Sequence, residues 1–281
     1  MIKPMLAHKY DPDRVIWDDY VYMQPKLDGV RCLFTKDGAF SRTGKQFMNV
    51  KHVEKMLGHF FKVLPWIVLD GELYNHNLRD DFEKIISLVR KQKPTDEDRS
   101  EAHRLIQYHV YDYTGIDYKS GEGVRYRDRM HHLNVSDMYC PSVQHVESKL
   151  VATPAMSKVI HQEFLDKGYE GSIMRLNSTY QQKRSYSLMK FKDFSDAEAT
   201  IVGYDVGQGK RTGTLGKFVM QDDDGVEFGC PPGKGYTYKD LAEILSNIDK
   251  YLGKRATFTY FERTKAGSYR HPLFKTLRNY E

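Results

Sequence analysis

The sequence predicts an α+β fold, with a large domain of antiparallel sheets and flanking helices followed by a small β-barrel domain. Apolar runs of strand length at 20–23, 30–34 and 66–69 are separated by amphipathic helical patterns, which indicates sheets covered by helices. The composition then changes, and short strand patterns separated by glycine turns follow. We therefore expect two domains, at residues 1–194 and 195–281.

The composition is that of an ordinary globular protein. Hydrophobic residues make up 40% of the 281 positions, and 43 basic against 38 acidic side chains give a net charge of +5. This charge is compatible with a polyanionic partner but does not identify one. Cys32, Cys140 and Cys230 lack the spacing of a zinc site or a disulfide framework, so we expect a reducing, cytoplasmic setting. We expect neither a signal peptide nor a membrane span, because no long apolar stretch occurs.

The segment from Gln24 to Arg31 is the one around which the chain is organised. Lys26 lies in a bend between two apolar runs and is followed by Asp28, Gly29 and Arg31. A lone buried ammonium is costly, and nearby cations with partial desolvation would favour the neutral, nucleophilic amine over its usual pKa of about 10.4. We expect Asp28 and Arg31 to form a charge pair beside it. A salt-bridged surface hairpin is the alternative, because short motifs often match by chance.

Two further stretches place carboxylates next to glycine at an apolar strand. Asp70-Gly71-Glu72 follows the run 66–69, and Glu170-Gly171 leads into the run 172–175. Carboxylates in such positions need cations or hydroxyls to offset desolvation, and Glu170 is a candidate ligand for a hard cation. The alternative is that both are ordinary turn carboxylates.

An aromatic residue and two lysines are the next candidates. Tyr111 precedes Asp112 in the predicted strand 105–113, where a tyrosine is usually a core residue. The alternating strand 188–192 puts Lys190 and Lys192 on one face, where an anion such as a triphosphate would relieve their repulsion. A lysine-guarded edge strand is the alternative.

The other expected elements complete the first domain. A hairpin turn at 36–38 leads to a loop carrying Arg42 and Lys45, which are either phosphate contacts or solvated charges. We expect polar loops at 92–100 and 177–187. The predicted helices lie at 52–62, 80–91, 124–133 and 154–167.

The second domain reads as a small barrel. Strand patterns at 199–204, 217–221, 226–229 and 255–261 and one helix at 239–251 fit the oligonucleotide-binding (OB) fold, although only four of its five strands can be placed. Lys210 and Arg211 lie on a glycine-flanked loop, as candidates for DNA-backbone contacts or as solubilising charges. The segment 270–278 is basic and aromatic.

In this order, these stretches resemble the motifs of the covalent nucleotidyltransferases, which comprise ATP-dependent DNA ligases, RNA ligases and mRNA capping enzymes. The resemblance covers nearly the whole chain and is greatest to the minimal DNA ligases of bacteriophages and other viruses, which join an ATP-grasp-like adenylation domain to an OB-fold domain. The matching stretches are Lys26-x-Asp28-Gly29-x-Arg31 for motif I, Asp70-Gly71-Glu72 for motif III, Tyr111-Asp112 for motif IIIa, Glu170-Gly171 for motif IV and Lys190-x-Lys192 for motif V.

The resemblance implies an ATP-dependent ligase that seals nicks in duplex DNA through a lysyl-AMP on Lys26 and a DNA-adenylate. It implies ATP as the substrate and Mg²⁺ as the cofactor, held by Glu170 and Asp28, with Glu72 nearby. The implied nucleotide contacts are Gln24, Arg31, Glu72, Tyr111, Lys190, Lys192 and Arg278. The implied contacts to DNA phosphates are Arg42, Lys210 and Arg211.

Arg278 lies in a region that resembles motif VI but lacks the Asp-Lys that usually follows in the family. The implied partner is nicked double-stranded DNA, with a monomeric enzyme, no membrane contact and a cytoplasmic location (the host cytoplasm for a viral protein). An RNA ligase, a GTP-using capping enzyme and a non-catalytic nucleic-acid-binding protein remain as alternatives at this point.

Overall fold

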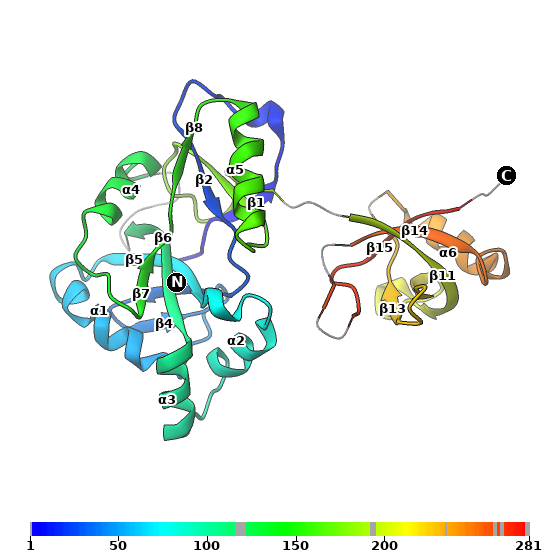
Figure 1. The fold of residues 1–281 in the computed structure, drawn as a ribbon, viewed down its shortest axis with the longest axis horizontal. Coiled ribbons are helices and arrows are strands. Elements are labelled where there is room, and N and C mark those ends of the chain that lie inside the picture. The colour runs from blue at the N-terminus through cyan, green and yellow to red at the C-terminus, as the bar shows by residue number, and fades with distance from the viewer. Residues whose placement is uncertain are drawn as a thin grey trace. The chain divides into compact units, whose positions relative to one another are not determined.

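The computed structural model describes residues 2–115, 122–191, 195–233, 235–260, 263–264 and 267–278, which Figure 1 draws as a ribbon. The chain divides into two compact units, Met1–Phe191 (unit 1) and Lys192–Glu281 (unit 2). Among the described residues, unit 1 contains two five-stranded sheets and unit 2 contains one. No described helix is long and apolar enough to cross a membrane.

Sheet A of unit 1 has the strand order β1, β10, β9, β2, β8. The strand bounds are Leu6–Lys9 (β1), Arg184–Phe191 (β10), Ser172–Leu176 (β9), Val21–Pro25 (β2) and Lys149–Val151 (β8). Helix α5 (Pro154–Asp166) lies beside β2 and β8 (Figure 1). Its Ile160 and Phe164 pack into one apolar cluster with Met23, Met174 and Met189. One face of sheet A is therefore apolar and covered by α5.

Sheet B of unit 1 has the strand order β4, β3, β5, β6, β7. The strand bounds are Gly38–Phe40 (β4), Val30–Thr35 (β3), Ile67–Tyr74 (β5), Gln107–Gly115 (β6) and Val143–His145 (β7). The helices α1 (Lys51–Val63), α2 (Phe82–Val89) and α3 (Asp96–Leu105) contribute buried side chains to one core with β3, β5 and β6. Helix α4 (Tyr126–Asn134) packs against β6. Sheet B thus also has one apolar, helix-covered face.

The four predicted helices of this unit form, with ends shifted by two residues or fewer. The predicted loop at 92–100 is wrong from residue 96, because α3 begins there. Thr95 caps that helix: the Asp98 N–H donates to the Thr95 hydroxyl at 3.2 Å, and the Thr95 N–H donates to the Asp98 carboxylate at 3.0 Å. Ala102 is the one buried residue of α3, so its sequence has no apolar stripe that would reveal a helix. The capping pattern of Thr95 and Asp98 was the sequence signal available. The predicted loop at 177–187 is likewise wrong from Arg184, where β10 begins.

Unit 2 is a five-stranded barrel with the order β13, β12, β11, β14, β15. The bounds are Ser195–Val206 (β11), Leu215–Gln221 (β12), Glu227–Cys230 (β13), Tyr238–Ser246 (α6), Arg255–Tyr260 (β14) and Leu273–Leu277 (β15). A parallel bridge links Pro232, two residues after the end of β13, to Phe274 of β15, with the Phe274 N–H donating to the Pro231 carbonyl at 2.9 Å. Closure of the barrel and the helix between its third and fourth strands confirm the OB fold. The fifth strand, β15, lies in the basic and aromatic segment where no strand was predicted.

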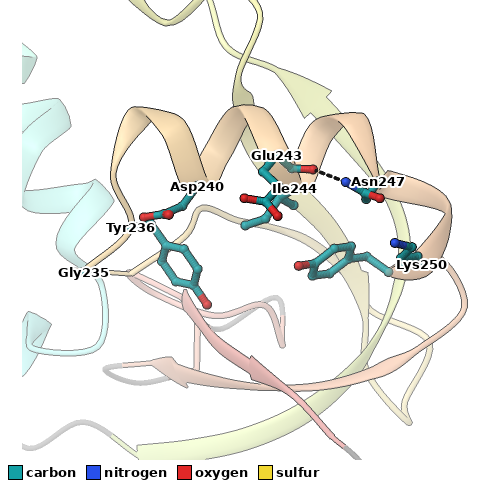
Figure 2. A pocket seen from close by; sticks show the side chains of 8 residues that line it. Gly235, Tyr236, Asp240, Glu243, Ile244, Asn247 and Lys250 are labelled. Carbon is teal, nitrogen blue, oxygen red and sulfur yellow. Dashed lines mark hydrogen bonds between the residues drawn. The ribbon is translucent and has the colours of Figure 1, made fainter.

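A pocket of about 590 Å³ opens beside α6 in unit 2 (Figure 2). The Asp240 carboxylate at its edge accepts hydrogen bonds of 2.7 Å from the backbone and hydroxyl of Thr237, and Asn247 donates to the Glu243 carbonyl at 3.0 Å. The lining residues are Gly235, Tyr236, Asp240, Glu243, Ile244, Asn247, Lys250 and Tyr251. None of the residues predicted from the sequence to form the site lines this pocket.

Candidate active site

In each sheet of unit 1, the face that the helices leave uncovered carries polar side chains. In sheet A, Gln24 lies opposite Ile173, and Ile173 lies opposite Lys190, so all three share one face. Lys26 follows Gln24 by two residues and therefore continues that face just beyond the end of β2. The register thus brings Lys26 and Lys190 to the same side of sheet A.

The corresponding face of sheet B carries Arg31, Asp70 and Glu72. Arg31 on β3 lies directly opposite Glu72 on β5, and Asp70 is two residues earlier on the same strand. The alternate residues of β5, Leu69 and Leu73, are fully buried in the helix-covered core. The period of two along the strand therefore separates the charged face from the core face.

Hydrogen bonds join the polar faces of the two sheets. The Gln24 amide of β2 donates to the Tyr111 carbonyl of β6 at 3.3 Å, and Arg175 of β9 donates to the Asp112 carboxylate of β6 at 2.7 Å. Tyr180, between β9 and β10, donates its hydroxyl to the Asp70 carboxylate at 2.6 Å. The candidate site thus lies where the two sheets meet inside unit 1.

Lys26 is held by both its backbone and its side chain. Its N–H donates to the Gly171 carbonyl at 2.9 Å, and its carbonyl accepts from the Glu170 N–H at 3.2 Å. The Lys26 ammonium and the Glu170 carboxylate form an ion pair, in which the side chains are 19% and 5% exposed. Lysine and glutamate from distant parts of the sequence are therefore paired in a largely buried position. The opposite charge of Glu170 stabilises the ammonium form of Lys26.

Glycine at two positions allows this close packing. A Cβ atom on Gly29 would lie 2.5 Å from the Leu73 carbonyl oxygen and 2.8 Å from Cγ of Glu72. A Cβ atom on Gly171 would lie 2.5 Å from the Phe191 carbonyl oxygen, and Gly171 also has a φ of +147°. Any larger residue at either position would push apart segments that carry Lys26, Glu72 and Glu170.

Arg31 forms its ion pair with Asp70. Its Nε and Nη2 donate to the two oxygens of Asp70 at 2.9 and 2.5 Å, a bidentate geometry that fixes the guanidinium plane. The sequence predicted Arg31 to pair with Asp28, and it predicted that Asp70 needs a cation or a hydroxyl without identifying Arg31 as that cation. The pairing follows from the register of β3 with β5. Asp28 itself is half-buried, two residues after Lys26.

Glu72 has an unusual electrostatic environment. Desolvation raises the pKa of its carboxyl to about 8, against the opposing effect of the cations Arg31 and Lys26. The positive charge of Lys26 lowers the pKa of Glu72, and the same ammonium is ion-paired with Glu170. Both carboxyl groups therefore lie near one amine. Perturbed carboxylates around a buried amine are typical of functional sites.

A β-bulge positions Tyr111 and Asp112. Along the β5–β6 pair, Gly71 is opposite Val110 and Asp70 is opposite Asp112, which leaves Tyr111 as an extra residue. The Tyr111 hydroxyl donates to Glu72 at 3.3 Å, and the Arg31 and Arg175 guanidinium carbons lie 5.7 and 5.3 Å from the centre of its ring. Sequence reasoning placed the aromatic residue on the correct strand but gave no sign of the bulge.

Asp112 is the centre of a buried ion network. Arg129 binds both of its oxygens at 2.7 and 3.1 Å, and Arg175 donates to the second oxygen at 2.7 Å. The exposed fractions are 0% for Asp112, 2% for Arg129 and 4% for Arg175. Burial raises the pKa of Asp112, and the two arginines more than offset it, so its pKa lies below the usual value. Sequence reasoning missed both arginines; an arginine at an alternate position of the buried strand β9 was the available signal for Arg175.

Gln24 is buried, and the described structure uses both ends of its amide. Its oxygen accepts from Arg175 at 2.6 Å, and its nitrogen donates to the Ser148 hydroxyl at 2.8 Å as well as to the Tyr111 carbonyl. A direct contact between Gln24 and a nucleotide therefore stays a prediction, while its contacts within the protein tie β2 to β6 and β9.

The remaining candidates are carried by other segments of the chain. Arg42 is exposed on a turn in which the Ser41 N–H donates to the Lys45 carbonyl at 2.8 Å. In unit 2, Lys210 is exposed and Arg211 is half-buried on a short turn, Gly209–Arg211, and Arg278 forms an exposed ion pair with Glu198. Lys192 lies outside the described residues.

The carboxylates are suited to a hard cation. Among the described residues, no group of three or more His, Cys, Asp or Glu side chains gathers as a metal site. Mg²⁺ is usually held by one or two carboxylates together with substrate phosphates and water. Glu170 and Glu72, which both lie near the Lys26 amine, would suit a magnesium ion that binds together with a nucleotide, while the part of Asp28 in holding the ion stays a prediction.

Comparison with known proteins identifies the two units. Residues 4–192 match the family model of the ATP-dependent DNA ligase domain, and residues 206–278 match that of the DNA ligase OB-like domain. A DNA ligase of Haemophilus influenzae is 23% identical over 273 residues, covering 93% of this chain and 92% of the relative. The DNA ligase of enterobacteria phage T6 is 23% identical over 302 residues, covering 89% of this chain and 62% of the phage protein.

Solved structures agree in fold. A Lig E DNA ligase, from a structure–function study of DNA binding with a minimal scaffold, aligns with a TM-score of 0.79 at 21% identity, covering 99% of this chain and all of that one. The ATP-dependent DNA ligase of bacteriophage T7, solved with ATP, aligns with a TM-score of 0.57 at 19% identity, covering 98% of each chain. Because the ligase domain model matches well over half of the residues, this chain belongs to the family of ATP-dependent DNA ligases, enzymes whose general activity is to seal nicks in DNA.

Proposed function

We propose that Lys26 is the residue that carries AMP while this enzyme seals nicks in duplex DNA. The observation that supports this most strongly is the largely buried pair of Lys26 and Glu170, which lies close to Glu72 where the two sheets of unit 1 meet. Membership of the DNA ligase family, with both an adenylation and an OB-like domain, speaks against the RNA ligase, capping-enzyme and non-catalytic alternatives.

In the first step, the neutral amine of Lys26 attacks the α-phosphorus of ATP. A nitrogen–phosphorus bond forms, the bond to the bridging oxygen breaks, and pyrophosphate leaves. The amine must first lose its proton, and Glu170 opposes this loss as long as its negative charge faces the ammonium. Adenylylation therefore requires that the charge of Glu170 be compensated when the nucleotide binds.

The second and third steps act on the DNA. An oxygen of the 5′-phosphate at the nick attacks the adenylate phosphorus, and the Lys26–phosphorus bond breaks to give the DNA-adenylate and a free amine. The 3′-hydroxyl then attacks the 5′-phosphate phosphorus, a phosphodiester forms, and AMP leaves. The Lys26 nitrogen gives up one proton before its attack and a second as the nitrogen–phosphorus bond forms, and it takes up both again when that bond breaks and the ammonium is restored. The 3′-hydroxyl loses its proton as the phosphodiester forms.

Around Lys26, each polar face supplies contacts to the nucleotide. On sheet B, Glu72 binds the ribose, Tyr111 stacks on the purine, and Arg31 contributes positive charge from its fixed position on Asp70. On sheet A, Gln24 contacts the nucleotide, while Lys190 and Lys192 bind its phosphates. Arg278 of unit 2 acts on the pyrophosphate. Positive groups aimed at the phosphates stabilise the charge that develops during transfer.

Magnesium and DNA complete the proposal. Mg²⁺ held by Glu170 and Asp28 would neutralise phosphate charge and withdraw the carboxylate's stabilising effect from the Lys26 ammonium. Arg42 binds the phosphate at the nick, and Lys210 and Arg211 bind the DNA backbone. In this reading residues 1–194 form the adenylation domain, residues 195–281 form the OB domain, and the enzyme acts as a monomer in the cytoplasm.

The test uses the whole protein with ATP labelled on the α-phosphate. We expect label to remain on the protein after denaturation, and nicked DNA to be sealed far better than nicked RNA. Lys26→Arg keeps a positive charge beside Glu170 but lacks a nucleophilic amine, so it should stay folded and take up no label. Lys26→Ala should behave in the same way. Sealing by either variant with ATP would overturn the assignment of Lys26, and a preference for GTP would favour a capping-type enzyme.

A further inference from the structure

The hydrogen bond between Tyr111 and Glu72 joins two side chains to which the proposed function gives separate tasks. The Tyr111 hydroxyl donates to Oε2 of Glu72 at 3.3 Å across the β5–β6 pair. Stacking on a purine requires only an aromatic ring, so the hydroxyl is not needed for that task. Its contact with Glu72 suggests a second task that a phenylalanine could not perform.

The β-bulge makes this contact possible. In regular pairing, Tyr111 would lie opposite Asp70, whereas the extra residue moves Asp112 into that place. Asp112 is then fixed by Arg129 and Arg175, so the backbone beside Tyr111 is held by a buried network. Bulges commonly redirect side chains next to active sites. The buried network thus holds the backbone next to Tyr111, whose side chain reaches Glu72 from the bulge.

Glu72 requires such a neighbour to have a defined orientation. The torsion of a carboxylate about its last carbon–carbon bond is soft, so packing alone fixes it poorly. The nearest cation along the sheet, Arg31, has its bidentate hydrogen bonds on Asp70. The Tyr111 hydroxyl orients one oxygen of the Glu72 carboxyl group and leaves the other for a ligand.

We propose that Tyr111 is a positioning residue for sugar recognition: its hydroxyl holds the Glu72 carboxyl group in the orientation that forms a hydrogen bond with a hydroxyl of the ribose, so that the enzyme prefers ATP to a deoxyribose analogue. This inference rests on the proposed function, in which Glu72 binds the ribose. Ordering a free carboxylate at the moment of binding costs affinity, and Tyr111 makes that ordering part of the folded protein.

The test measures single-turnover adenylylation of the full-length protein with ATP, 2′-deoxy-ATP and 3′-deoxy-ATP. The main variant is Tyr111→Phe, which keeps the ring and removes only the donor. We expect its second-order rate constant for adenylylation with ATP to fall about threefold to tenfold, mostly through a higher half-saturating ATP concentration. For the analogue that lacks the hydroxyl bound by Glu72, we expect the same rate constant to change by less than about twofold. The ratio of the rate constants for ATP and that analogue should therefore decrease.

Two further variants separate this role from a structural one. Glu72→Gln should reduce the same discrimination, and adding Tyr111→Phe to it should cause no further loss, because the two groups act as one unit. Tyr111→Leu removes the ring and should weaken all three nucleotides together. Thermal unfolding of each variant confirms that it is folded.

The inference is overturned if Tyr111→Phe lowers the rates with ATP and both analogues by one common factor, or leaves all of them unchanged. Failure of the proposed function looks different, because the native protein itself would then form no adenylate on Lys26. A native enzyme that adenylylates Lys26 but shows the same sugar preference as Tyr111→Phe refutes the role of the hydroxyl alone.

Discussion

Ion pairs between acidic and basic side chains occur both in the buried interior of unit 1 and on the solvent-exposed surface of the protein. Asp112 is fully buried and is bound by Arg129 and Arg175, whereas the surface pair of Asp196 and Lys275 has side chains that are 50% and 55% exposed. Desolvation makes each buried charge depend on its partners, while a surface charge is solvated with or without one. Substitutions in the interior should therefore affect folding, and those on the surface should affect binding to DNA.

The largest expected difference is in stability. Asp112→Asn leaves two buried arginines without their counter-charge, so we expect a loss of about 3–5 kcal/mol in the free energy of unfolding. Asp196→Asn is the matched surface change and should cost less than about 1 kcal/mol. Urea denaturation of both variants provides the measurement. Similar losses for the two would mean that burial does not distinguish these pairs.

The next largest effect concerns the exposed turn that carries Arg42. Arg42→Ala should lower nick sealing about tenfold by removing a charged contact to a phosphate, while adenylylation of Lys26 and the melting temperature stay close to native. Lys45→Ala on the same turn is the control and should change sealing by less than about twofold. A lower melting temperature in Arg42→Ala, or an equal loss of nick sealing in both variants, would contradict a specific contact between Arg42 and the phosphate.

A third prediction concerns Glu72, whose desolvation should be measurable through the pH dependence of stability. Its carboxyl has a pKa of about 8 in the folded protein against an ordinary 4.5, so the folded state favours the protonated form. The resulting contribution to stability is present below the ordinary pKa and is lost as pH rises towards 8. Glu72→Gln cannot ionise, and we expect its stability relative to native to increase between pH 5 and pH 8. Melting temperatures at matched pH that run parallel would contradict this.

The smallest expected effects belong to Lys210 and Arg211 on the barrel. Each contact to a DNA phosphate releases counterions, so Lys210→Ala should weaken DNA binding evenly across sequences and reduce the salt slope of log K by about 1. Lys250→Ala changes a lysine elsewhere on unit 2, beside the pocket of Figure 2, and serves as the control. An unchanged slope in Lys210→Ala would remove that residue from the proposed DNA contacts.

Pattern-based prediction worked where one segment carries the whole signal. The apolar alternation of β2, β3 and β5 and the glycines beside Lys26, Glu72 and Glu170 are local, and the family prediction built on them is confirmed. Prediction failed for α3, in which eight of ten residues are polar or charged, and for β15, which lies in a segment read as a basic and aromatic tail. Periodicity in the sequence reveals an element with a buried apolar face, and α3 and β15 each bury one residue.

The sequence by itself determined the order of the motifs and the division into an adenylation part and a barrel, and it singled out Lys26 as the candidate nucleophile, because each depends on residues that lie close together in the chain. The tertiary structure alone decided which groups are partners: Arg31 with Asp70, Lys26 with Glu170, and Asp112 with two arginines from α4 and β9. Those pairs depend on strand register and on a single bulged residue. A shift of one residue in pairing would turn these side chains to the opposite face, and no local pattern records it.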